Sequence, residues 1–232
     1  MRVRFLVLAS SFALAAISMF GAARADTLDT IRSRGAFIIG YREGAPPFSS
    51  VDAQGHPQGY SIDLCNRIAD AVKAALKMND LKVQYVPVTA ENRIDKLESG
   101  AIDIECGSTT RTLGRQERVD FTLFTFITGT EMLVLETSDI RGPDNLKGKK
   151  IAVQAGTTTE DAIKRIAAAR GAQIVSVKSS DEGMALVESG QADAYASDEI
   201  VLIGLASAAK SPRGVRLSAW ECAEGATLSA LE

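Results

Sequence analysis

The sequence predicts an α/β protein of two similar halves, each a mainly parallel sheet flanked by helices, with a cleft between the halves. Short apolar runs alternate with helical patterns along most of the chain, as parallel strands with crossover helices require. In addition, the pattern Glu-Ser-Gly-x-x-Asp occurs twice, at residues 98–103 and 188–193. Helix–glycine–strand joints favour such residues. The repetition is therefore either chance or the mark of one joint present in both halves.

In the first half, apolar residues recur at helical spacing in some segments and fill short β-branched runs in others. The expected elements are a helix at 28–34, a strand at 36–40, a helix from an N-cap at Ser61 to about residue 78, a strand at 82–88, a helix at 91–98 and a strand at 102–106. A long apolar stretch at 124–135 follows. It is too short to span a bilayer, which takes about 20 residues, and we interpret it as extended chain crossing between the halves.

The second half repeats the alternation of strand and helix. The expected elements are a strand at 151–153, a helix from about residue 157 to 170, a strand at 173–177, a helix at 181–188, a strand at 192–196 and a helix at 198–209.

Composition is that of a globular protein with a packed core: of the 232 residues, 46% are hydrophobic and 24% charged, and the mean hydropathy is +0.04. Such a chain suits one domain or two small lobes.

The first 25 residues are predicted to be a secretory signal peptide. Arg2 and Arg4 precede an apolar run at 5–20, and Ala23-Arg24-Ala25 is a cleavage signal, so cleavage is expected before Asp26. The apolar run is short for a membrane anchor, and no cysteine for a lipid anchor stands at the cleavage site. We therefore expect a soluble periplasmic protein.

The charge balance argues against nucleic acid as a partner. Without the three basic residues of the signal peptide, 23 basic residues remain against 29 acidic ones, whereas nucleic-acid binding needs a basic face. An acidic protein can still bind a small anion through a local pair of arginines.

The three cysteines, Cys65, Cys106 and Cys222, fit no zinc spacing and leave at least one thiol unpaired, so their disulfide state stays open. We expect Cys65, in an apolar helical run, to be a buried small side chain. A thiol enzyme is disfavoured because the only histidine, His56, sits in a turn. Nothing in the sequence implies a metal or a cofactor.

Two arginines stand where ligands of parallel sheets are often bound. Arg42 follows the first strand, and ligands collect at the carboxyl ends of such strands, although an exposed arginine is the plainer interpretation. Arg93 opens a helix, where the dipole disfavours a cation, so an anionic partner is one interpretation. A surface ion pair with Asp95 or Glu98 is the alternative.

Two strand-to-helix connections of the second half can each be interpreted as a structural cap or as a ligand contact. Residues 156–160, Gly-Thr-Thr-Thr-Glu, are either a plain helix cap with a capping-box acid or an anion site at a helix start. No Gly-Lys-Ser/Thr follows, which excludes a nucleotide P-loop. Asp198 is either a helix N-cap or a carboxylate facing a ligand ammonium.

The ordered combination of motifs over about residues 27–210 resembles the periplasmic solute-binding proteins of amino-acid ABC importers, family 3, and most of all their glutamate/aspartate-binding branch. The matching motifs are Gly40-Tyr41-Arg42-Glu43, Pro47-Phe48-Ser49, Gly59-Tyr60-Ser61-Ile62-Asp63, Glu91-Asn92-Arg93-Ile94, Glu105-Cys106-Gly107-Ser108-Thr109-Thr110, Arg115-Gln116, Asp120-Phe121, Leu146-Lys147-Gly148-Lys149, Gly156-Thr157-Thr158 and Glu188-Ser189-Gly190. The resemblance implies the type II periplasmic-binding-protein fold, whose two lobes close on the ligand by a hinge motion.

The resemblance also implies a ligand set. Arg93 would bind the α-carboxylate of an acidic amino acid and Arg42 its side-chain carboxylate, while Asp198 would pair with the α-ammonium. Ser108, Thr110 and Thr158 would add hydrogen bonds. Two forked guanidinium groups and one acid are the minimum complement of two carboxylates and one ammonium.

The chain departs from that branch at Ala90 and Ser180, where a serine and a histidine are expected, which leaves the choice among glutamate, aspartate and their amides open. Residues 215–232 do not resemble the segment that returns to the first lobe in the family. We therefore divide the chain into a signal peptide (1–25), a first lobe (26–134) that is incomplete without that return, a second lobe (135–214) and a divergent tail (215–232).

The expected function is the capture of glutamate or aspartate by a monomer, without covalent chemistry, and its delivery to a membrane permease. One alternative is a periplasmic enzyme of the same fold, such as a dehydratase of cyclic acids, which needs a general acid or base in the cleft. The extracellular part of a sensor and a non-functional truncated binding protein are two others.

Overall fold

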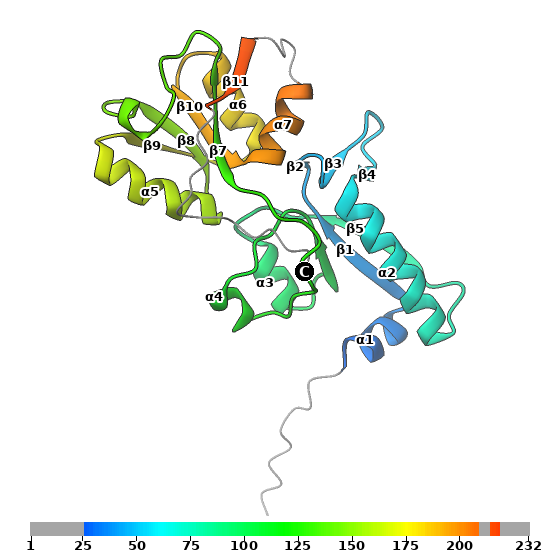
Figure 1. Cartoon of the computed structure of the whole chain (residues 1–232). Helices are drawn as coiled ribbons and strands as arrows, with labels where there is room; N and C mark the ends of the chain where they lie inside the picture. Colours follow the sequence, from blue (N-terminus) through cyan, green and yellow to red (C-terminus); the bar gives the residue numbers. More distant parts are fainter. Residues whose placement is uncertain (1–25, 209–213, 219–232) are drawn as a thin grey trace, which may run out of the picture.

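The computed structural model describes residues 26–208 and 214–218, which form two lobes, each built on its own sheet (Figure 1). The predicted signal peptide, Cys222 and the rest of the tail beyond residue 218 lie outside the described residues. No described helix is both long and apolar enough to cross a membrane.

The first lobe contains three parallel strands in the order β5-β1-β6. Its elements are α1 (Thr27–Arg34), β1 (Ala36–Tyr41), α2 (Tyr60–Leu76), β5 (Lys82–Pro87), α3 (Arg93–Glu98), β6 (Ile104–Cys106) and the short α4 (Leu113–Gln116). The loop after β1 forms a small antiparallel sheet of β2 (Gly44–Ala45), β3 (Ser49–Val51) and β4 (Pro57–Gln58). The core of this lobe lies between α1, α2 and the sheet, around Ile31, Ile39 and Ile62.

The second lobe contains five strands in the order β11-β7-β10-β8-β9. Its elements are β7 (Thr130–Leu135), the 3₁₀ turn η1 (Pro143–Asn145), β8 (Lys150–Gln154), α5 (Thr158–Arg170), β9 (Gln173–Val177), α6 (Ser180–Glu188), β10 (Ala194–Asp198), α7 (Glu199–Ala208) and β11 (Val215–Leu217). Strands β8, β9 and β10 are parallel, whereas β7 and β11 run antiparallel along one edge.

The second sheet is buried on both faces. Side chains alternate across a strand, so Leu133 of β7 belongs to the core beside α6 and α7, while its neighbours Met132 and Val134 belong to the core beside α5. This two-sided burial explains why Met132 to Leu135 of β7 are all apolar. From the sequence alone, this segment was interpreted only as extended chain crossing between the halves.

The repeated Glu-Ser-Gly-x-x-Asp pattern is the same structural joint in both lobes. Asp103 donates its backbone N–H to the Ile38 carbonyl and accepts the Ile38 N–H on its carboxylate (2.7 Å), and Asp193 does the same with Lys150 (2.8 Å). Gly100 and Gly190 both have a φ of +70°, which a residue with a side chain rarely adopts. The repetition is therefore not chance.

Two predicted boundaries differ from the structure. The border between 134 and 135 falls inside β7, since Thr130–Leu135 pairs along its length with strands of the second lobe. Val215–Leu217, assigned to a divergent tail, is the edge strand β11, because its alternating side chains continue the second sheet. We therefore place the described part of the second lobe at 130–208 and 214–218.

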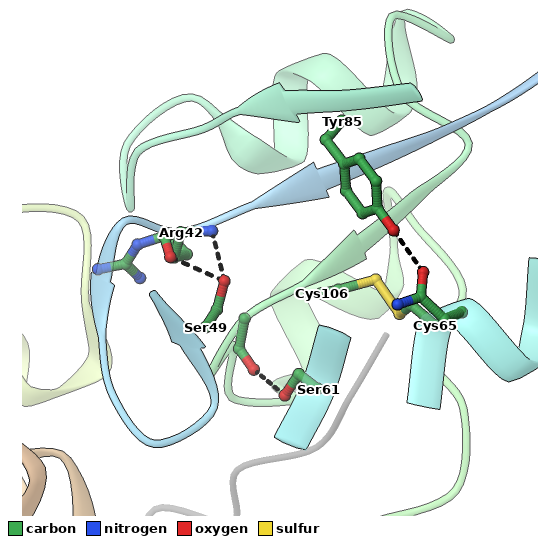
Figure 2. Close-up of a disulfide and its surroundings, with 8 residues drawn as sticks. Arg42, Ser49, Ser61, Cys65, Tyr85 and Cys106 are labelled. Carbon is green, nitrogen blue, oxygen red and sulfur yellow. Dashed lines mark hydrogen bonds between the residues drawn. A yellow bond between two sulfur atoms is a disulfide. The ribbon is translucent and has the colours of Figure 1, made fainter. Parts of the chain in front are cut away.

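The predicted N-cap at Ser61 is wrong. Gly59 is the residue before the first turn of α2. A Cβ there would lie 2.4 Å from the Phe48 carbonyl oxygen, so the close approach of the loop before β3 to the helix start requires glycine. The Ser61 hydroxyl donates instead to the Gly107 carbonyl (2.7 Å; Figure 2).

Candidate ligand-binding cleft

A pocket lies between the two lobes and encloses about 350 Å³ of space, part of it open to solvent. All six residues that the sequence proposed for a ligand line it. The lining residues are Arg42, Ala45, Arg93, Ser108 and Thr110 from the first lobe, and Gln154, Thr157, Thr158, Thr159, Ser180, Ser197, Asp198 and Val201 from the second.

Arg42 is held by its own loop. It follows the last residue of β1, and the Ser49 hydroxyl both accepts the Arg42 N–H (2.8 Å) and donates to the Arg42 carbonyl (2.7 Å), as Figure 2 shows. The side chain is 5% exposed and reaches the second lobe, where a terminal N–H donates to Gln154 Oε1 (2.8 Å). The interpretation of Arg42 as an ordinary exposed arginine is therefore wrong.

Arg93 is also buried, with 2% exposure, at the first position of α3. Its Nε has no hydrogen-bond partner among the described residues. The predicted alternative, a surface pair with Asp95 or Glu98, is wrong because both carboxylates bind Arg118 instead. Buried polar nitrogens are usually hydrogen-bonded, so the Nε of Arg93 is an exception that calls for a partner from outside the described chain.

Burial makes this pair of cations costly. Desolvation and, after it, the positive charge of Arg93 lower the pKa of the Arg42 guanidinium to about 10, while the Glu105 and Asp198 carboxylates oppose the change. Arg42 therefore stays cationic at neutral pH, and an anion in the pocket would stabilise its charge.

Hydroxyl groups and a helix start complete the anion-binding side. The Thr110 and Thr158 hydroxyls lie 3.1 Å apart across the cleft. Thr157 caps α5 by accepting the Glu160 N–H (3.1 Å), and Glu160 Oε2 accepts the Gly156 N–H (3.0 Å). The predicted cap is thus confirmed, and the positive end of α5 faces the pocket.

Asp198 is the last residue of β10, immediately before α7, and is 7% exposed. It is the only carboxylate among the described residues that line the pocket. It therefore supplies the negative group of a lining that also contains two arginines.

Sequence reasoning assigned no ligand contact to Gln154, Ser180 or Ser197 of the lining, although it noted Ser180 as a departure from the resembled branch. Each stands at a carboxyl end of a strand of the second sheet or at the start of the following helix, which is the signal that identified Arg42 and Asp198. Glu105 was also missed. It is 1% exposed, and neither carboxylate oxygen has a hydrogen-bond partner in the described chain.

A disulfide joins Cys65 of α2 to Cys106 at the end of β6, with a Cα–Cα distance of 6.4 Å (Figure 2). The expected burial of Cys65 is confirmed, and the disulfide state that the sequence left open is a bond to Cys106. The bond fixes the chain two residues before Ser108. Closing a loop of this length stabilises the fold by roughly 4 kcal/mol.

No group of three or more histidine, cysteine or acidic side chains that could hold a metal ion occurs in the described ranges.

Comparison with known proteins identifies the family. Residues 37–203 match the sequence profile of the bacterial extracellular solute-binding proteins, family 3. The chain belongs to this family.

Two curated relatives of this solute-binding protein carry informative names. The chain is 38% identical over 209 residues to the glutamate/aspartate import solute-binding protein of Salmonella typhimurium, covering 89% of this chain and 69% of the relative. It is 40% identical over 189 residues to the L-glutamate/L-aspartate-binding protein of Pseudomonas aeruginosa, covering 80% and 63%. The chain thus spans about two thirds of the length of each relative.

Solved structures agree on the fold. The cysteine-binding protein from Campylobacter jejuni has a TM-score of 0.77 at 28% identity, covering 89% of this chain and 80% of that one. An ancestral amino acid-binding protein, described as a precursor of cyclohexadienyl dehydratase, has a TM-score of 0.72 at 32% identity, covering 83% and 80%. The predicted type II periplasmic-binding-protein fold is confirmed.

Proposed function

We propose that this protein binds glutamate or aspartate in the periplasm and delivers it to the permease of an ABC importer. The observation that carries the proposal is the pair of buried guanidinium groups, Arg42 and Arg93, in one pocket with a single carboxylate, Asp198. An acidic amino acid presents two carboxylates and one ammonium, which matches this set group for group. The names of the two relatives support the same ligand class.

In this proposal, Arg93 binds the α-carboxylate together with Ser108, Thr110, Thr158 and the N-terminus of α5. Arg42 binds the side-chain carboxylate, and Asp198 accepts hydrogen bonds from the α-ammonium. Charged hydrogen bonds of this kind are about twice as strong as neutral ones. Ligand affinity would therefore rest mainly on the three charged side chains.

Binding without chemistry is better supported than catalysis on the same fold. A dehydratase needs a group that removes or delivers a proton. Among the described lining residues, no histidine, cysteine or lysine occurs, and Asp198 is already required for the ammonium. The ancestral structural neighbour, too, is named as an amino acid-binding protein.

Arg93→Ala tests the proposal. We expect titration calorimetry to show glutamate or aspartate binding to the wild type, and the variant to lose about 2–5 kcal/mol of binding free energy because the α-carboxylate would have no fork to bind. Arg67→Ala, which removes an exposed arginine of α2, is the control and should bind as the wild type does. Absence of binding of both acids by the wild type would overturn the proposed ligand class, and normal affinity in Arg93→Ala would overturn the role of Arg93.

A further inference from the structure

Gln154 is a neutral side chain of the lining that hydrogen-bonds to a charged group of the pocket across the cleft. It ends β8, is 7% exposed, and accepts a hydrogen bond from the Arg42 guanidinium through Oε1 (2.8 Å). The two residues come from different lobes, so this bond exists only when the lobes are close together.

The orientation of the Gln154 amide is fixed by its other end. Nε2 donates to the Lys178 carbonyl oxygen (2.9 Å), which can only accept. Rotating the amide by half a turn would place Oε1 against that carbonyl and the amino group against the guanidinium N–H, so both bonds would be lost. Gln154 therefore presents its amide oxygen, and not its amino group, to Arg42.

The Lys178 peptide is itself anchored. Its N–H donates to Glu182 Oε2 (2.7 Å), and Glu182 donates its backbone N–H to the Ser179 hydroxyl that caps α6 (3.1 Å). A continuous set of hydrogen bonds thus runs from the start of α6 through Gln154 to Arg42. Because α6 packs on the second sheet, the acceptor is held by a rigid part of the lobe.

A neutral acceptor has a consequence that a carboxylate would not have. It occupies one of the five N–H groups of the guanidinium without cancelling its charge. The remaining N–H groups keep a fixed direction, and the full positive charge stays available to an anion. A carboxylate at the same place would instead pair with Arg42 and compete with an anionic ligand.

We propose that Gln154 is a specificity-determining residue that positions Arg42 for a carboxylate on the ligand side chain. This inference rests on the proposed function, because it assigns the Arg42 subsite to the second carboxylate of an acidic amino acid. It predicts that Gln154 changes the choice between glutamate and glutamine, and not only the overall affinity.

The test compares L-glutamate and L-glutamine binding by calorimetry in the wild type, Gln154→Ala, Gln154→Glu and the control Gln173→Ala. Gln173 is an exposed glutamine on the neighbouring strand β9. In Gln154→Ala we expect glutamate affinity to fall about tenfold, as one hydrogen bond to a charged group is lost, and glutamine affinity to fall less because a neutral amide depends less on Arg42. In Gln154→Glu the new carboxylate competes for Arg42, and glutamate affinity should fall on the order of 100-fold.

The ratio of the two affinities decides the matter. A glutamate-to-glutamine ratio that falls in both Gln154 variants and is unchanged in Gln173→Ala supports the inference. Equal losses for both ligands, or no loss, would show that Gln154 serves only closure or packing and would overturn it. Failure of the wild type to bind either acidic amino acid defeats the proposed function, and the inference with it. Acid binding with an unchanged ratio in the variants defeats the inference alone.

Discussion

Two guanidinium groups determine most of the chemistry of the cleft at the scale of single residues. Arg42 and Arg93 are both nearly inaccessible to solvent, and the positive charge of Arg93 destabilises the charged form of Arg42. Burying a charge without a matching partner costs several kcal/mol. The protein lowers that cost for Arg42 through Gln154 and the nearby Glu105, but it leaves the Nε of Arg93 unpaired within the described chain. A ligand with two carboxylates would supply what is missing.

Arg42→Ala should therefore change selectivity rather than abolish all binding. Losing the fork for the side-chain carboxylate should weaken glutamate binding by about 2–5 kcal/mol, whereas glutamine should lose less because its side chain carries no charge. Calorimetry with both ligands measures the difference. If glutamate and glutamine binding were weakened equally, Arg42 would not be the residue that binds the ligand side chain.

Residues with a local misfit were the ones that sequence reasoning could find. Arg93 stands out because a cation at a helix start is unfavourable, and Arg42 because it follows a strand and precedes a loop that cannot be helical. Gln154 also ends a strand, but a neutral side chain is no misfit there, and its partner Arg42 lies 112 residues away in the chain. The disulfide was open for a similar reason, because three cysteines allow three pairings and the spacing favours none.

At the scale of elements, the N-terminus of α5 is the best-defined part of the site. Thr157 and Glu160 satisfy backbone N–H groups of the first turn and of the preceding glycine. Gly156 has a φ of +76°, and a Cβ on it would lie 3.0 Å from the backbone of Ala90, so a side chain at position 156 would crowd the first lobe. Such a joint needs residues of particular conformation, which is why its pattern is readable in the sequence.

Glu160→Gln tests the cap through its dependence on pH. Partial burial alone would raise the pKa of Glu160, but hydrogen bonds from Lys164 and the Gly156 N–H outweigh it, so the pKa lies below its ordinary value. A carboxyl whose pKa is lowered by folding stabilises the protein above its unfolded pKa of about 4.3 and loses that contribution as the pH falls through the folded value. At pH 7 the variant should lose about 0.5–1.5 kcal/mol of unfolding free energy.

Urea unfolding at pH 7 and near pH 3 measures this effect. The loss of unfolding free energy should be smaller at the lower pH, because the wild-type carboxyl is then increasingly protonated and becomes neutral, like the glutamine amide of the variant. Glu136→Gln, which changes an exposed acid after β7, is the control and should cost little at either pH. A loss for Glu160→Gln that is as large in acid as at neutral pH would contradict the ionic contribution.

Short elements were the ones that the sequence did not predict. β2, β4 and β11 are two or three residues long, which is too short to show the alternation of polar and apolar side chains. They form because their backbones pair with the longer strands β3 and β7. Strands β1, β5, β8 and β9 and the helices α2, α5 and α6 were predicted within a few residues, because each has an apolar pattern of its own.

At the scale of the whole molecule, hydrogen bonds between described residues of the two lobes connect them at the cleft. They include Arg42 to Gln154, Thr110 to Thr158, and Arg115 to the Gly156 carbonyl (3.3 Å). Only the first two involve residues of the pocket lining. Arg115 also donates to the Thr110 carbonyl of its own lobe (2.6 Å). Its guanidinium therefore connects the loop after β6 in the first lobe to the glycine turn before α5 in the second. The two-lobed arrangement follows from the repeated joint in the sequence, but these contacts depend on how the lobes meet.

Arg115→Ala should weaken every ligand alike, in contrast to the Gln154 and Arg42 variants. Its bond to Gly156 forms only between closed lobes and does not involve the lining, so its loss should lower the population of the closed form without changing the subsite for the side chain. We expect affinity to fall about two- to tenfold for glutamate and glutamine, the worth of a single hydrogen bond. Arg118→Ala is the matched control, because Arg118 lies on the same segment but pairs with Asp95 and Glu98 inside the first lobe. Calorimetry gives the affinities, and resonance energy transfer between one dye on each lobe reports closure as ligand is added. A loss confined to glutamate, or an equal loss in Arg118→Ala, would show that Arg115 does not act by holding the lobes together.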